Sequence, residues 1–443
     1  MGGGRWVVVV VDGGWWWTVG GRCGQWWMVE GDGGGVVDGD GGGGQWCEKH
    51  KVAAFKISYP KHVLIESIYS YSSFSSVIIE SSMKRIAKGS YGYGHCYGYG
   101  GHDQEDRLSS LSDDLLIPIL SHLDTKLAVQ SSILSKRWVN LWKFLPVLNF
   151  TSHNVKSDYY FFIHKVLVDR SNSIVINRFN IRVSDYRTVA RVLRDALTHG
   201  VSDLSIDTSE NLDKYRPISC FKSSDSLIHL SLKGMLDFGK LPSFVGLVSL
   251  RLERARIVES EPFSCFPNLE KLYLVNCKME ICSAGLEVIA SKLSVLSISS
   301  CFHIPVPYFE LMLSTPKLTL LELEGLIPMG FVVVDELPCL HTVHIDLYFT
   351  HNFDGVVNYQ QKFNLIHMLG YFKNAECVHL SPSTVELLSL SESMLVKEHC
   401  PFDNLKLLNL IPPPNKPAPQ LDSWVTAYLF KDCPRVVVKA MPR

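Results

Sequence analysis

One six-residue pattern recurs along the second half of the chain and decides its fold. It reads LVSLRL at 247–252, LEKLYL at 269–274, LSVLSI at 293–298 and LTLLEL at 318–323. Leucine or isoleucine stands at the first, fourth and sixth positions, and the residues between them are mostly polar. This alternation predicts a short strand with one buried face. One such strand cannot bury its leucines alone, so the pattern predicts neighbouring units stacked around a shared core.

Five further copies extend the pattern in both directions. They read VSDLSI at 201–206, LIHLSL at 227–232, LHTVHI at 340–345, AECVHL at 375–380 and LKLLNL at 405–410. The nine copies begin 20 to 35 residues apart, and most spacings fall in the range of about 20–29 residues typical of leucine-rich repeats. We therefore expect a parallel sheet over 201–411, with an inserted loop or helical excursion within 346–374. The predicted fold class is α+β, with an α/β solenoid of leucine-rich repeats.

Charged and aromatic residues alternate with the leucines and should share the concave face of the solenoid. Two cysteines, Cys277 and Cys301, follow predicted strands and are better explained as core or ladder residues than as redox sites. A solvated face without a partner is the alternative to a binding surface. The candidate target-binding residues are Arg251, Glu253, Lys271, Tyr273, Glu322, Glu324, His344 and Asp346.

A compact helical module is predicted before the repeats, at 104–150. Ser112 can cap a first helix, with Asp113 and Asp114 favoured at its start by the helix dipole. Thr125 can cap a second helix, and Ser135 can cap a third. Three short helices bury little surface, so the module should need a partner to cover its apolar faces. The apolar residues at helical spacing are Leu111, Leu115, Leu116, Ile119, Leu120 and Leu123 in the first helix, and Trp138, Leu141, Trp142 and Leu145 in the third.

The stretches LSSLSDDLLIPILSHL (108–123) and AVQSSILSKRWVNLW (128–142) resemble an F-box of the plant F-box/LRR (F-box/FBD/LRR-type) family. The resemblance implies that the module docks the Skp-type adaptor of SCF ubiquitin ligases and, through it, the cullin. The repeat array would then bind an unknown target protein for ubiquitination. The implied adaptor-binding residues are Leu108, Leu111, Asp113, Leu115, Leu116, Ile119 and Leu120, followed by Val129, Ser132, Leu134, Lys136, Arg137, Trp138, Leu141 and Trp142.

Two departures from the family pattern motivate an alternative function. Ser112 stands where the family usually has proline, and Pro118 lies inside the first helix, where proline removes a backbone hydrogen bond. The alternative is a repeat scaffold with a degenerate F-box and no ligase role.

The remaining segments flank these two parts. Residues 1–101 hold dense Gly, Trp and Tyr tracts and are expected to be a disordered extension. Residues 151–200 should link the parts through a helix near 160–169, a strand near 174–183 and a helix ending near Gly200. Residues 412–443 resemble the FBD region of the same family, with a helix and a terminal strand.

Composition excludes several other functions. The 43 Lys and Arg balance 44 Asp and Glu, so nothing draws the chain to nucleic acid or an anionic membrane. No phosphate-loop, zinc-protease or hydrolase motif occurs, so we expect no catalytic residue, cofactor or metal. An enzyme hidden within 346–374 is a further alternative. The 12 scattered cysteines and the lack of a signal peptide favour the cytoplasm or nucleus.

Overall fold

A computed structural model describes much of the chain beyond residue 110. The described residues are 6–11, 14–20, 26–30, 110–150, 159–171, 173–183, 186–208, 215–217, 224–239, 241–281, 285–301, 310–328, 330–349, 359–413, 417–431, 433 and 435–440. The chain forms two compact units, which divide between Leu145 and Pro146.

The first unit contains the predicted helical module. Helix α2 spans Asp113–Ser121 and α3 spans Thr125–Gln130. Two 3₁₀ helices follow, η1 at Ser131–Ile133 and η2 at Trp138–Phe144. The expected third helix is therefore a 3₁₀ helix. Its first backbone N–H, that of Trp138, donates to the carbonyl of Ser135 at 3.1 Å.

Two details of the helix ends differ from the sequence prediction. Asp124, rather than Thr125, caps α3, because its carboxylate accepts from the backbone N–H of Lys126 at 2.9 Å. Ser112 is the N-cap residue of α2, but its side chain makes no capping bond. Pro118 lies within α2 without ending it. Its exposed ring sits beyond the first turn, and the helix continues to Ser121.

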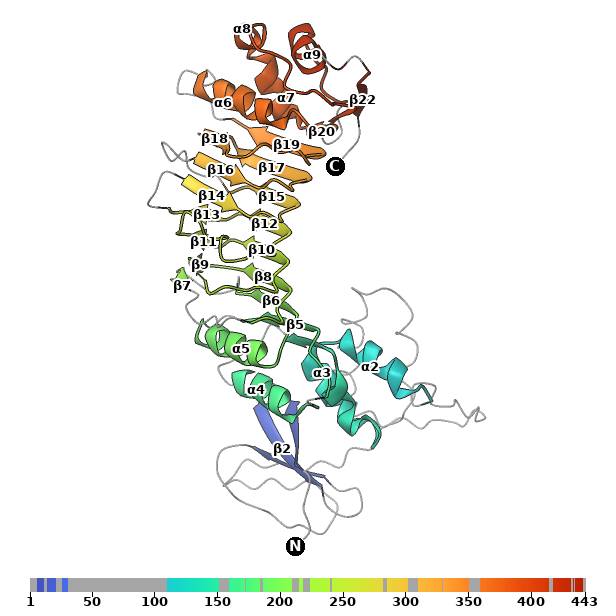
Figure 1. Cartoon of the computed structure of the whole chain (residues 1–443). Helices are drawn as coiled ribbons and strands as arrows, with labels where there is room; N and C mark the ends of the chain where they lie inside the picture. The colour runs from blue at the N-terminus through green and yellow to red at the C-terminus, as the bar shows by residue number, and fades with distance from the viewer. Residues whose placement is uncertain are drawn as a thin grey trace, which may run out of the picture. The chain divides into compact units, whose positions relative to one another are not determined.

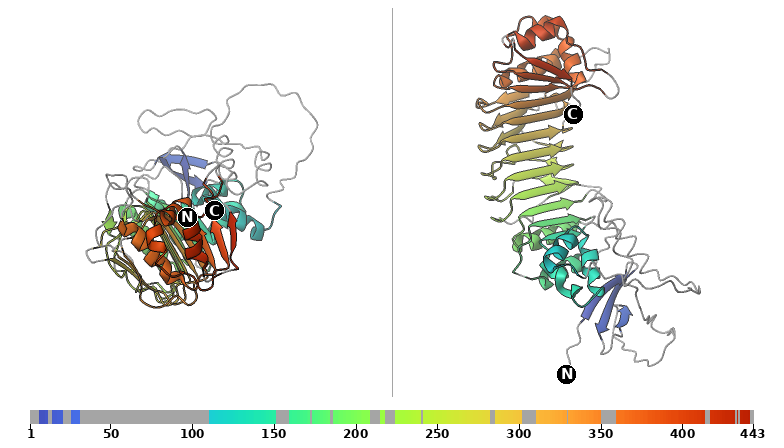
Figure 2. Two further views of the ribbon diagram at one scale, coloured as in Figure 1. Left: turned by 90° about the horizontal axis from the view of Figure 1, so that it is seen from above. Right: turned by 90° about the vertical axis from the view of Figure 1, so that its right-hand side faces the viewer.

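The second unit is built on an open sheet of twelve parallel strands (Figures 1 and 2). Each of the nine predicted copies supplies one strand, so that prediction is confirmed. Strands β4, β5 and β22 extend the sheet at its ends, and β4 was expected to belong to the helical module. In spatial order the strands are β4 (Val147–Phe150), β5 (Arg178–Arg182), β6 (Asp203–Asp207), β8 (His229–Lys233), β10 (Ser249–Glu253), β12 (Lys271–Val275), β15 (Val295–Ser299), β17 (Leu320–Leu326), β19 (Thr342–Tyr348), β20 (Cys377–Leu380), β21 (Leu407–Leu410) and β22 (Val437–Ala440).

Two smaller sheets run along the other side of the same unit (Figure 1). One parallel sheet joins β7 (Arg216–Pro217), β9 (Leu236–Phe238), β11 (Arg256–Ile257) and β13 (Lys278–Met279), and a second joins β14 (Gly285–Ile289), β16 (Glu310–Ser314) and β18 (Gly330–Val333). The chain thus leaves the long sheet after each strand, passes along the other side and returns one strand further on.

Helices occupy the two ends of this unit. The predicted linker helices are α4 (Tyr159–Asp169) and α5 (Tyr186–Thr198), and the excursion predicted within 346–374 contains α6 (Tyr359–Leu369) and η3 (Gly370–Phe372). The C-terminal part adds α7 (Pro382–Ser389), α8 (Glu392–Leu395) and α9 (Ser423–Phe430).

The core of the second unit is a ladder of apolar residues in register. Leu250, Leu272, Leu296 and Leu321 are aligned on neighbouring strands, and each is fully buried. The chain leaves several strands through a residue with positive φ. The values are 59° at Arg254, 51° at Asn276, 54° at Ser300 and 124° at Gly234, while Gly325, with φ of 129°, lies within β17. In β8, β10, β12 and β15 this residue directly follows the strand, so the chain turns out of the sheet at the same level in these four units.

Three strands occur near the N-terminus, within the extension predicted to be disordered. Strand β2 (Gly14–Gly20) pairs antiparallel with β1 (Trp6–Val11) and with β3 (Trp26–Glu30). The difference has a physical reason, since the valine and tryptophan runs consist of residues that favour extended backbone. The rest of 1–101 lies outside the described residues, and there the prediction stays a prediction.

Candidate functional site

The residues implied as adaptor-binding divide into a core and a surface. The core residues are Leu116, Leu120, Ser132, Trp138 and Leu141, all at most 8% exposed. They hold the helices together, so their side chains are not available to a partner. Leu111, Ile119, Val129, Leu134 and Trp142 are half-buried, and Asp113, Leu115, Lys136 and Arg137 are exposed. Leu108 lies outside the described residues.

The exposed apolar residues of the module form the stronger candidate for a docking surface. Leu115 and Ile133 are each 54% exposed, and Phe144 is 39% exposed. These three large apolar side chains are the candidates for a protein contact on the module. The sequence resemblance implied Leu115 as a docking residue, but not Ile133 or Phe144. Helical spacing alone could not show which of the adjacent apolar residues turn outward.

Two of the implied docking residues contact each other. The Arg137 guanidinium donates from Nε to Oδ1 of Asp113 at 2.8 Å, and its Nη2 lies 2.6 Å from the same oxygen. Both side chains are partly exposed, so this ion pair contributes little to stability. It does fix a charged pair at the start of α2.

The second candidate surface is the outward side of the twelve-stranded sheet, which we call the polar face. The first, third and fifth residues of the five-residue strands β5 to β15 point to this face, while the second and fourth are buried. Strand register aligns the third residues into a middle row that runs Arg251, Tyr273, Ser297, Glu322 and His344. All eight predicted target-binding residues lie on the polar face.

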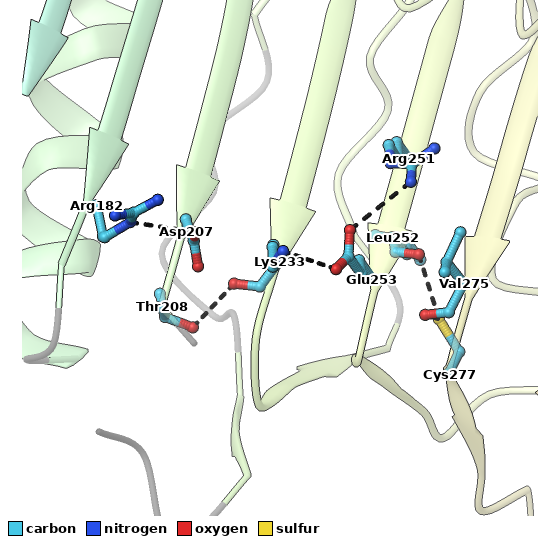
Figure 3. Close-up of polar contacts among 9 residues, drawn as sticks. All are labelled: Arg182, Asp207, Thr208, Lys233, Arg251, Leu252, Glu253, Val275 and Cys277. Carbon is cyan, nitrogen blue, oxygen red and sulfur yellow. Dashed lines mark hydrogen bonds and ion pairs between the residues drawn. The ribbon is translucent and has the colours of Figure 1, made fainter. Parts of the chain in front are cut away.

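Polar contacts join neighbouring strands along the last row of this face, and a further contact lies within β10 (Figure 3). Arg182 Nε lies 3.4 Å from Oδ2 of Asp207. Lys233 Nζ lies 2.8 Å from Oε1 of Glu253, and Arg251 Nη2 lies 3.7 Å from Oε2 of the same carboxylate. Glu253 therefore has two cations beside it. Arg251 and Glu253 were predicted from the sequence. Lys233, which has the same strand position as Glu253 one unit earlier, was not.

An imidazole pair occupies the middle row further along. The rings of His344 and His379 stack with centroids 3.9 Å apart and planes at 12°. Nδ1 of His379 accepts from the Asn409 amide at 3.1 Å, and its Nε2 lies 3.2 Å from Sγ of Cys377. Burial lowers the pKa of His379 to about 4, with a further lowering from His344 and an opposing effect of Glu322. The sequence indicated both histidines near strands but not that they stack.

The two cysteines singled out from the sequence are buried ladder residues. The Cys277 thiol donates to the carbonyl of Leu252 at 3.4 Å (Figure 3), and the Cys301 thiol donates to that of Leu274 at 3.4 Å. Each thus bonds to the strand one unit earlier. This arrangement agrees with the structural role expected from their positions.

The chain resembles known proteins over most of its described length. Residues 108–150 match the F-box domain. A putative F-box/FBD/LRR-repeat protein of Arabidopsis thaliana is 31% identical over 370 residues, which cover 74% of this chain and 72% of that protein. The chain belongs to the F-box/FBD/LRR-repeat protein family. The family resemblance predicted from the sequence is therefore confirmed.

Two FBD-associated F-box proteins of Arabidopsis thaliana are also similar to this family member. One is 32% identical over 259 residues, covering 54% of this chain and 61% of that protein. The other is 27% identical over 361 residues, covering 74% of this chain and 86% of that protein. The F-box match contains the whole helical module and also β4, which the structure assigns to the large sheet.

Within the described parts of this F-box/FBD/LRR-repeat protein, no three or more His, Cys, Asp and Glu side chains gather in a way that could hold a metal ion. Among those same residues, no helix has the length and apolar character needed to cross a membrane.

Proposed function

We propose that this protein is a substrate-recognition subunit of an SCF-type ubiquitin ligase. The helical module docks a Skp-type adaptor and, through it, a cullin. The second unit is a leucine-rich-repeat solenoid whose polar face binds a target protein. The chain itself carries no catalytic residue, and other subunits transfer the ubiquitin. The proposed compartment is the cytoplasm or nucleus, supported by the scattered cysteines of the sequence.

One observation carries this proposal. The F-box match at 108–150 coincides with a small unit that leaves Leu115, Ile133 and Phe144 at its surface. Covering such side chains with a partner removes apolar area from water, which is favourable by about 25 cal/mol per Å².

Binding of the full chain to a purified Skp-type adaptor tests the proposal. We expect micromolar or tighter binding by calorimetry. Leu115→Glu should weaken it at least about tenfold, because a charge on an exposed apolar contact must be desolvated on binding. Val396→Glu provides the matched control, since Val396 is 73% exposed and lies after α8. Its change should leave adaptor binding unaltered.

The degenerate scaffold is the second candidate, favoured by Ser112 and by Pro118 within α2. If the folded wild-type chain does not bind the adaptor, the ligase role is contradicted. Binding that appears only in a Ser112→Pro, Pro118→Ala double variant would then identify a degenerate F-box.

A further inference from the structure

The charges of the polar face are not evenly distributed along the sheet. On β8, β10 and β12 the face carries the cations Lys233, Arg251 and Lys271 and one carboxylate, Glu253. Glu253 lies within 4 Å of two of these cations. The group has a formal charge of +2, from three cations and one carboxylate. We call it the basic patch.

Further along the sheet the sign reverses. On β17 and β19 the face carries Glu322, Glu324 and Asp346, and neither strand contains a lysine or arginine. Glu324 and Asp346 are register partners on adjacent strands. Like charges directly opposite each other repel and destabilise the pair, so a cation from a partner would be favourable here. We call these three residues the acidic patch.

Strand β15 separates the two patches with uncharged residues. It presents Val295, Ser297 and Ser299 to the same face. In the middle row, Arg251 and Glu322 are three strands apart. At about 4.8 Å per strand this is about 14 Å, which an extended peptide at about 3.3 Å per residue spans in about four residues.

We infer that the polar face binds an extended peptide segment with an acidic group and a basic group separated by about four residues. The acidic group lies over the basic patch and the basic group lies over the acidic patch. Charge complementarity selects this partner, and either chain direction satisfies it. The inference deepens the proposed function, because it names the chemistry of the target segment that the solenoid recognises.

Selection from a phage-displayed library of random dodecapeptides on the immobilised full chain tests this inference. We expect enriched sequences to carry acidic and basic residues about three to five positions apart, in either order. A synthetic peptide of the enriched type should bind at least about tenfold more tightly than one with its charges shuffled together. Its binding should weaken as salt is raised.

A charge-reversed variant provides the sharper test. With Arg251→Glu and Lys271→Glu, the enriched sequences should become basic at both positions. A misfolded variant would lose binding but could not gain this new preference. Lys397→Glu, an exposed lysine after α8, is the matched control and should leave the enriched set unchanged.

Three results would overturn the inference. The first is enrichment of peptides with no regular spacing between acidic and basic residues. The second is that the Arg251→Glu, Lys271→Glu variant enriches the same peptides as the wild type. The third is that the folded wild-type chain enriches no peptides. The same shift in the Lys397→Glu control would also overturn it, because net charge would then explain the selection. The selection needs no adaptor, and Leu115→Glu should select the same peptides as wild type. Loss of adaptor binding and loss of peptide selection are therefore distinguishable failures.

Discussion

The helical module and the strand array differ in the sequence pattern of their buried leucines. In the module, adjacent leucines of one helix differ in burial, since Leu115 is 54% exposed and Leu116 is fully buried. In the array, every second residue of β17 is inward and apolar, while Glu322 and Glu324 face outward. The module consequently presents the apolar side chains of Leu115, Ile133 and Phe144, and the polar face of the array presents charged residues. Apolar surface suits a partner held by burial, whereas charged rows suit selection among partners.

The largest expected effect comes from the same cavity made in each unit. Leu116→Ala and Leu296→Ala both remove a fully buried side chain, and each should cost about 2–5 kcal/mol. A unit as small as the module has about 3–5 kcal/mol of stability in all, so Leu116→Ala should unfold it. The array should survive Leu296→Ala, because its core continues through neighbouring strands.

Hydrogen exchange resolved by segment separates the two outcomes. Leu116→Ala should remove protection across 113–144 and leave the strands of the array protected. Leu296→Ala should lower protection around β12, β15 and β17 while the helices are unaffected. Protection of 113–144 that persists in Leu116→Ala would show that the module is much more stable than its size implies.

A smaller effect concerns the residues with positive φ that recur in the array, none of which lies among the described residues of the module. Gly325 has φ of 129°, and a Cβ there would lie 3.3 Å from Cα of Ser300. Gly325→Ala should therefore destabilise the chain by about 1–3 kcal/mol. Arg254, at the same place in another unit, has φ of 59°, in the left-handed region where non-glycine residues are strained.

Arg254→Gly is the matched reversal and should be neutral or stabilising by up to about 1 kcal/mol. Urea unfolding of both variants measures the difference. If the two changes lowered the free energy of unfolding equally, the backbone conformation at these positions would not determine which residue is more stable there.

The same contrast explains how far the sequence predicted the structure. All nine strands of the repeat pattern were found because alternate burial is a local property with a fixed period of two. The end strands β4 and β22 do not carry the full leucine pattern. The residues of the polar face followed from the same alternation, and the register placed them together.

The exposure of the module's apolar residues was harder to predict, because packing between its helices determines which side chains are buried. Leu115 and Leu116 fit the same helical pattern, and only packing against η2 decides which is buried. Ile133 and Phe144 were missed for this reason. The stacking of His344 on His379 was not predicted, because the two residues are 35 positions apart in sequence. The helical segment between their strands has no fixed length, so the sequence does not show which residues of the two strands are aligned.

The last expected effect concerns that imidazole pair, which lies in the middle row of the polar face. Burial, followed by repulsion from His344, lowers the pKa of His379 to about 4 from its ordinary value of 6.5. The unfolded chain therefore binds a proton between about pH 6.5 and 4 that the folded chain does not bind. Stability should fall as the pH falls through this window and should be fully present above it.

Imidazole resonances followed by NMR from pH 7.5 to 3.5 provide the measurement. We expect the His379 titration near pH 4 in the wild-type chain, higher in His344→Ala and lower still in Glu322→Gln, because Glu322 opposes the lowering. A titration near 6.5 would mean that water reaches the ring and that the stacked pair does not form. The polar face would then gain positive charge beside the acidic patch in mild acid, and its contrast with the apolar module would depend on pH.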